Sequence, residues 1–103
     1  MVVTKEEIKA ELRAAIQENP YCRQIKSVAV FGSHVLGTAT AESDVDVLID
    51  FDPQATIGLF EFVEIQEQLS LALGRPVDLL TPQALSEYFR RDVLEHAEPV
   101  YGA

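Results

Sequence analysis

Asp44 and Asp46, two positions apart, are the residues of this sequence with the clearest capacity for chemistry. Residues i and i+2 of a β-strand share a face, so these two carboxylates would lie close together. Neighbouring anions repel unless a cation lies between them, and Mg²⁺ prefers carboxylate oxygens, which it often links to substrate phosphates. The pair therefore indicates a magnesium site. From these residues alone, the alternative that an exposed strand edge carries two aspartates by chance has equal weight.

Gly32 and Ser33 end a short apolar run at residues 27–31. Glycine lets the backbone approach a phosphate closely, and serine adds a hydroxyl and an N–H group as donors. By itself, a Gly-Ser pair is also compatible with a plain tight turn. With an acidic pair following after the ten residues 34–43, we expect phosphate donors and metal ligands to converge at neighbouring strand ends. That arrangement suits in-line displacement at a nucleoside triphosphate.

Asp78 is the third carboxylate, and it lies in the short apolar run 77–80. An unpaired ionised aspartate among apolar neighbours would be costly, so the residue alone favours an exposed or ion-paired strand position. Beside two further carboxylates and a metal, it becomes a candidate metal ligand and general base. Two metal ions about 4 Å apart would clamp the attacking and leaving oxygens. A base would take the proton of the incoming hydroxyl.

The elements that must position these residues can be read from hydrophobic spacing and stop signals. Thr4 and Glu7 form a capping-box pattern that opens an amphipathic helix, which Asn19-Pro20 ends. Short apolar or alternating runs predict strands, and a longer periodic run predicts an amphipathic helix that Gly74 ends. The expected strands are 27–31, 44–51, 77–80 and an edge strand at 98–101; the expected helices are 59–73, one from Thr81 to about Tyr88, and a last stretch around Val93-Leu94.

This order of elements fits an α+β, or α/β-like, domain spanning residues 1–103, with a mixed sheet of about four strands flanked by helices. In the helix 59–73, Phe60 and Phe62 cannot both lie at the centre of one apolar stripe. A partner interface is one use for the surplus, and burial in the small core is the favoured one.

The composition excludes several classes of protein. There are 17 acidic against 8 basic residues and the net charge is −9, which disfavours direct binding of a long nucleic acid. A free nucleotide or a basic partner remains compatible with this charge. Cys22 is the one cysteine, so no disulfide can form within the chain. There is no membrane-spanning apolar stretch and no secretory pattern at the start, so we expect a cytoplasmic protein.

The stretches FGSHVLGTATAESDVDVLIDF and GRPVDLLTP resemble the minimal nucleotidyltransferases (MNT) of the polymerase-β-like superfamily. The resemblance runs from about Val28 to the terminal PVY. It implies the superfamily's fold, a mixed sheet flanked by helices. It also implies that Gly32 and Ser33 hold the triphosphate, and that Asp44, Asp46 and Asp78 bind two Mg²⁺ ions and carry catalysis. Many relatives have arginine where His34 and Leu36 stand here, so nucleotide binding and turnover are separable expectations.

Stand-alone MNT proteins are typically encoded beside a HEPN-domain partner. The resemblance therefore implies an antitoxin that moves AMP from ATP to a tyrosine hydroxyl of a HEPN toxin, within a homo- or hetero-oligomer. One alternative is a binding module without transfer activity that neutralises its partner by occlusion. Another is a transferase acting on a small molecule, such as an aminoglycoside, which would need a second domain or a dimer to complete the acceptor pocket.

Overall fold

A computed structural model describes residues 4–32 and 44–102, apart from the side chain of Phe89. The elements, in chain order, are α1 (Lys5–Glu18), the 3-10 helix η1 (Cys22–Gln24), β1 (Ile25–Phe31), β2 (Val45–Phe51), α3 (Leu59–Leu73), β3 (Val77–Leu80), the 3-10 helix η2 (Pro82–Ala84), α4 (Glu87–His96) and β4 (Glu98–Gly102). None of the helices among these residues is long and apolar enough to cross a membrane.

The four strands form one mixed sheet in the order β3-β2-β1-β4. The β1–β2 and β1–β4 pairs are antiparallel, and the β2–β3 pair is parallel. A parallel pair needs a crossover connection, and α3 supplies it between β2 and β3. The predicted α+β class and the mixed four-stranded sheet are thus confirmed.

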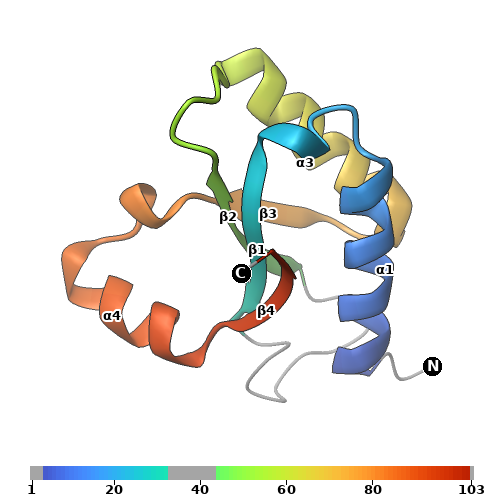
Figure 1. Cartoon of the computed structure of the whole chain (residues 1–103). Coiled ribbons are helices and arrows are strands. Elements are labelled where there is room, and N and C mark those ends of the chain that lie inside the picture. The colour runs from blue at the N-terminus through green and yellow to red at the C-terminus, as the bar shows by residue number, and fades with distance from the viewer. Residues whose placement is uncertain (1–3, 33–43, 103) are drawn as a thin grey trace.

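The hydrophobic core lies between the sheet and the two long helices. Figure 1 shows α1 and α3 together on one side of the strands, and α4 on the other side. Each of the two long helices contributes a stripe of buried residues at helical spacing, which packs on alternate residues of the strands. The core residues are Ile8, Leu12, Ile16, Ile25, Val28, Val30, Val45, Val47, Ile49, Ile65, Leu69, Leu73, Val77, Leu79 and Val100.

The predicted ends of the two long helices are confirmed by their caps. The Thr4 hydroxyl accepts a hydrogen bond from the Glu7 N–H at 3.1 Å, which satisfies one of the free donors of the first turn. Gly74 ends α3 in the left-handed conformation, with φ of 69°, and its N–H donates to the Ser70 carbonyl. The Gly74 cap fixes where the chain leaves α3 to begin β3.

The predicted helix from Thr81 to about Tyr88 is wrong. The chain makes only the short helix η2, and Leu85 then adopts an extended conformation. Ser86 starts the next helix, because its hydroxyl accepts from the Tyr88 N–H and so competes with continuation of the first helix. The Arg90 side chain donates to the carbonyls of Pro82 and Leu85 at 2.9 and 3.1 Å, which holds the corner in place. The last predicted helical stretch lies inside α4.

Candidate active site

Asp46 and Asp78 are direct neighbours on adjacent strands. They are register partners in the parallel β2–β3 pair, between the partners Val45–Val77 and Val47–Leu79. The flanking partners are buried in the core, so the alternation of strand side chains directs both aspartates to the opposite face. Asp46 is half-buried and Asp78 is exposed. Two carboxylates predicted from separate segments are therefore brought together on the face away from α1 and α3.

Gly32 closes the site from the side of β1. The last residue of that strand, Phe31, is the register partner of Asp46, so the chain turns at Gly32 beside this carboxylate. Gly32 has φ of 78°, which side chains other than glycine rarely adopt. A Cβ atom at Gly32 would also overlap the Asp46 Oδ2 atom and lie 3.1 Å from its Cγ. Both the backbone conformation and the approach to Asp46 therefore require glycine.

Asp44 immediately precedes β2 and is exposed. The strand starts one residue later than predicted, because the first bond of the ladder is donated by the Val45 N–H to the Pro76 carbonyl at 3.0 Å. Ser33 lies outside the described residues, as do His34 and Leu36. The structure thus gathers Gly32, Asp46 and Asp78, with Asp44 at the entry to the same strand.

The donor chemistry of this site fits a hard divalent cation. Carboxylate oxygens are preferred ligands of Mg²⁺, which commonly keeps waters and substrate phosphates as its remaining ligands. Within residues 4–32 and 44–102, no three His, Cys, Asp or Glu side chains are grouped as a complete metal site. A cation here would therefore draw on ligands outside this set of side chains. The assignment of the three aspartates to one metal centre stays a prediction.

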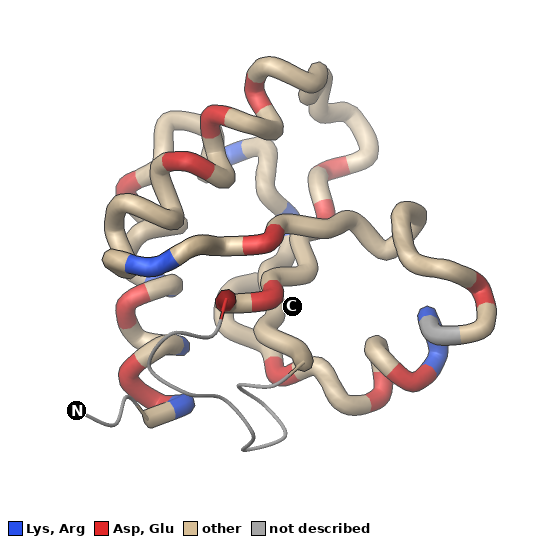
Figure 2. Tube along the Cα trace, turned by 180° about the vertical axis from the view of Figure 1, so that it is seen from behind, with Lys and Arg blue, Asp and Glu red and all other residues tan. Residues whose placement is uncertain are grey.

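The molecule has few cations to offset its acidic groups. Figure 2 shows acidic positions along most of the described trace and only scattered basic ones. Arg75, to which the sequence patterns assign no role, lies just before β3, three residues before Asp78. Its Nε and Nη1 atoms are buried and have no hydrogen-bond partner among the described residues. The sequence does place this arginine, because it directly follows the helix-ending Gly74 and therefore lies near the start of β3.

Comparison with known proteins gives the family. Residues 6–100 match the family described as a nucleotidyltransferase domain. The chain is 37% identical to the protein adenylyltransferase MntA of Thermococcus cleftensis over 100 residues, which covers 97% of each chain. It is 36% identical over 95 residues to a candidate protein adenylyltransferase of Methanocaldococcus jannaschii, covering 89% of this chain and 93% of the relative.

Solved structures share the fold. A candidate minimal nucleotidyltransferase is 30% identical, with a TM-score of 0.75, and the match covers 94% of this chain and 96% of the other. A toxin–antitoxin structure with AMP-PNP is 21% identical, with a TM-score of 0.74, over 92% of this chain and 73% of the other. The family match covers nearly the whole chain, and it includes Gly32, Asp44, Asp46 and Asp78. This chain therefore belongs to the nucleotidyltransferase domain family, and within it to the minimal nucleotidyltransferases of the polymerase-β superfamily.

Proposed function

We propose that this chain is a magnesium-dependent protein adenylyltransferase that moves AMP from ATP to a hydroxyl of a HEPN-type toxin, for which it is the antitoxin. The observation that carries the proposal is the meeting of Gly32, Asp46 and Asp78 at neighbouring strand ends, within a nucleotidyltransferase fold. A backbone turn that can approach a phosphate stands beside two carboxylates that can hold a cation. This juxtaposition suits phosphoryl chemistry.

The comparisons support the choice of nucleotide, acceptor and partner. The Thermococcus relative is a protein adenylyltransferase. One structural neighbour is a toxin–antitoxin complex with AMP-PNP, and another is an MNT antitoxin in complex with a tri-AMPylated HEPN toxin from Shewanella oneidensis. The net charge of −9 is compatible with a basic protein partner and unfavourable for a nucleic acid acceptor.

In the proposed reaction, Gly32 and Ser33 hold the triphosphate through backbone N–H groups and the serine hydroxyl. Asp44, Asp46 and Asp78 would hold Mg²⁺, which when bound offsets the negative charge of the phosphates and of the transition state. The acceptor hydroxyl oxygen forms a bond to the α-phosphorus, and the bond from that phosphorus to the bridging oxygen breaks. Pyrophosphate leaves with the electron pair. Asp78, which is exposed and borders Asp46, takes the proton of the acceptor hydroxyl.

The test is incubation of the chain with ATP, Mg²⁺ and the HEPN-type toxin proposed as its partner, followed by intact-mass measurement of that toxin. We expect added AMP with the native chain and a loss of at least about 100-fold in rate with Asp46→Asn, as for removal of one group that stabilises transition-state charge. Asp50→Asn is the matched control, because Asp50 lies on the same strand and on the same face, but four residues further on. Equal rates for the two variants would refute the site.

The second candidate function is a binding module that neutralises its partner by occlusion. The sequence observation that favours it is the absence of arginine at His34 and Leu36. In that case no AMP would be added to the partner although the complex forms. The double variant Asp44→Asn with Asp46→Asn would then neutralise the toxin as well as the native chain does. Loss of neutralisation in this variant, with binding intact, would favour catalysis.

A further inference from the structure

Helix α3 has a second apolar stripe that faces solvent. Its buried residues Ile65, Leu69 and Leu73 pack on the core. On the opposite side, Phe60 is 89% exposed and Leu71 is 82% exposed, with Val63 between them at 40%. The spacings of three, eight and eleven residues place these side chains on one helix face. Core burial, which the sequence favoured over a partner interface for the surplus apolar residues of this helix, is therefore wrong for Phe60, Val63 and Leu71.

Carboxylates are interleaved with this stripe. Glu64 and Glu67 are exposed and lie between Val63 and Leu71 on the same face. The Tyr21 hydroxyl donates a hydrogen bond to the Glu64 Oε2 atom at 2.9 Å, which anchors that carboxylate to the segment that follows α1. The side of α3 that is turned to solvent is thus both apolar and acidic. We refer to Leu59, Phe60, Val63, Glu64, Glu67 and Leu71 as the α3 outer face.

An apolar groove continues this surface around the start of α3. The groove has a volume of about 480 Å³, and Leu59, itself 77% exposed, lines its edge. Phe51 and Phe62 stack edge to face on its wall, with ring centroids 6.4 Å apart. Leu80 and Ala84 line the other side, from the end of β3 and from η2. In Figure 1 the first turns of α3 extend beyond the end of the sheet, so this surface projects from the molecule.

We propose that the α3 outer face and the adjoining groove are the docking surface for the protein partner, and that the partner presents apolar side chains bordered by lysine and arginine. The inference rests on the proposed function, because the partner is the HEPN-type toxin named there. A contiguous exposed apolar patch commonly marks an interaction site. The interleaved carboxylates add selection, because they favour a basic rim on the partner.

The charge of the chain argues against a second copy of itself as the occupant. A symmetric dimer through this face would bring Glu64 and Glu67 of one copy against those of the other. Each copy also carries a net charge of −9. Like charges placed opposite one another across an interface cost free energy, whereas a basic partner gains from the same carboxylates. The occupant that the surface selects is therefore a different, basic protein.

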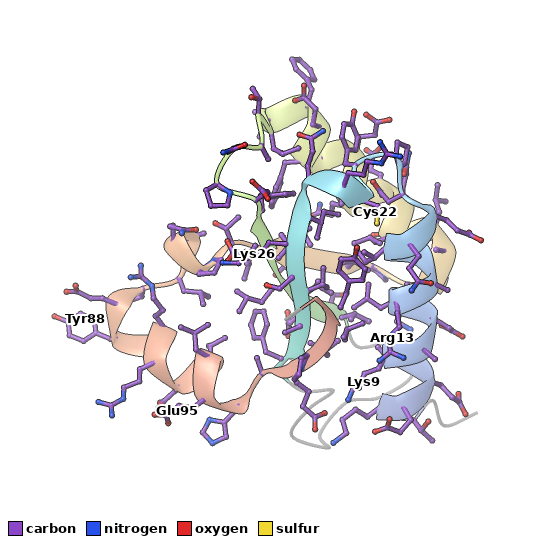
Figure 3. The ribbon with its side chains drawn as sticks, viewed as in Figure 1. Lys9, Arg13, Cys22, Lys26, Tyr88 and Glu95 are labelled. Atoms are coloured by element: carbon purple, nitrogen blue, oxygen red, sulfur yellow. The ribbon has the colours of Figure 1, made fainter. Side chains whose placement is uncertain are left out.

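The experiment measures the affinity of the HEPN protein for single variants of the full chain by biolayer interferometry. We expect Phe60→Ser to weaken binding about 30-fold, as expected for a central aromatic anchor. Its matched control is Tyr88→Ser, since Tyr88 is 84% exposed on α4 and points into solvent on the other side of the sheet from α1 (Figure 3). We expect the control to change affinity by less than about threefold.

A pair of charge reversals tests the acidic part of the proposal. Glu67→Lys should slow association about tenfold at low salt, and the difference should shrink as salt is added. Glu11→Lys, an equal change of charge at an exposed position of α1, should have a small effect. Unchanged affinity in Phe60→Ser, or an equal loss in Phe60→Ser and Tyr88→Ser, would overturn the proposed surface.

Two further measurements distinguish docking of the partner on this surface from self-association and from AMP transfer. Sedimentation of each variant alone reports self-association, and its loss in Phe60→Ser with unchanged partner affinity would assign the face to a second copy instead. Intact mass of the partner after incubation with ATP and Mg²⁺ reports AMP transfer. If the native chain binds through this face but adds no AMP, the proposed transfer fails and the docking surface stands. If the native chain adds AMP and Phe60→Ser binds the partner normally, the proposed transfer stands and the docking surface fails.

Discussion

Replacing Gly32 by alanine should damage both the stability and the activity of the protein, and the two effects can be separated with a control. Gly32 has φ of 78° and Gly74 has φ of 69°, so an alanine at either position pays a similar backbone cost, roughly 1–2 kcal/mol. The surroundings differ. A Cβ at Gly74 meets no atom of the described residues within 4 Å, whereas one at Gly32 overlaps the Asp46 carboxylate. The difference between the two variants therefore isolates the approach to Asp46.

The overlap cannot be relieved by turning the carboxylate alone. The added Cβ would also lie 3.3 Å from the Asp46 Cβ, which is fixed by the strand. Forcing an extra methyl group into a packed site costs about 1–3 kcal/mol. Gly32→Ala should therefore melt at least about 4 °C below Gly74→Ala, since 1 kcal/mol shifts the Tm of a domain of this size by roughly 4–8 °C. Thermal unfolding followed by circular dichroism measures this difference.

The same pair should separate in activity. Movement of Asp46 by even part of an ångström alters a proposed ligand of the metal, so we expect Gly32→Ala to lose most AMP transfer. Gly74→Ala should keep transfer near the native rate at a temperature at which both variants are folded. Equal melting temperatures together with full transfer by Gly32→Ala would show that the close approach of Gly32 to Asp46 has no consequence for stability or activity.

Three other changes test separate parts of the structure. Arg75→Met keeps the apolar stem but removes the two buried nitrogens that lack partners, and we expect the free energy of unfolding by urea to rise by about 1 kcal/mol; a fall would show that the guanidinium is satisfied. The hydrogen bond to Glu64, followed by desolvation and the charges of Glu64 and Glu61, raises the pKa of Tyr21 above its ordinary value of 10.0. The folded state thus holds the Tyr21 proton more tightly than the unfolded state does. The stability that this adds is fully present below pH 10 and is lost as the pH rises through the higher pKa of the folded state. The Tm of Tyr21→Phe should consequently depend less on pH above 10 than that of the native chain. Finally, Arg90→Met removes the two bonds that hold the corner at residues 81–86, and limited proteolysis should cut there faster, while an unchanged rate would show that the corner is held by other contacts.

The sequence predicted the strands well because their patterns are local. The alternation from Asp44 to Phe51 and the apolar run 77–80 each specify a strand without reference to the rest of the chain. The direct pairing of Asp46 with Asp78 could not be predicted in the same way. It depends on the length and the packing of α3, which sets the register of the parallel pair.

The errors came from competition between local preferences. Thr81 and Pro82 are good helix-starting residues, but Ser86 offers a second start, and the bonds from Arg90 hold an extended residue between the two. The outward position of Phe60 is likewise invisible to a periodicity argument, because two apolar stripes on one helix cannot be ranked without knowing which side meets the sheet. The break at residues 81–86 and the exposure of Phe60 are both determined by tertiary packing.

The position of Asp78 at the margin of the sheet has a consequence for solubility. β3 is an edge strand of four residues, and an edge strand can pair with a strand of another molecule. Two of its N–H groups donate to side chains of α3, that of Val77 to Ser70 Oγ at 3.0 Å and that of Leu79 to Gln66 Oε1 at 3.2 Å. A short strand with an exposed charge is a poor template for such pairing. At the other edge, Pro99 removes one donor from β4. A carboxylate proposed to serve catalysis would thus also discourage aggregation, and replacing Asp78 by valine would expose an apolar edge to other molecules.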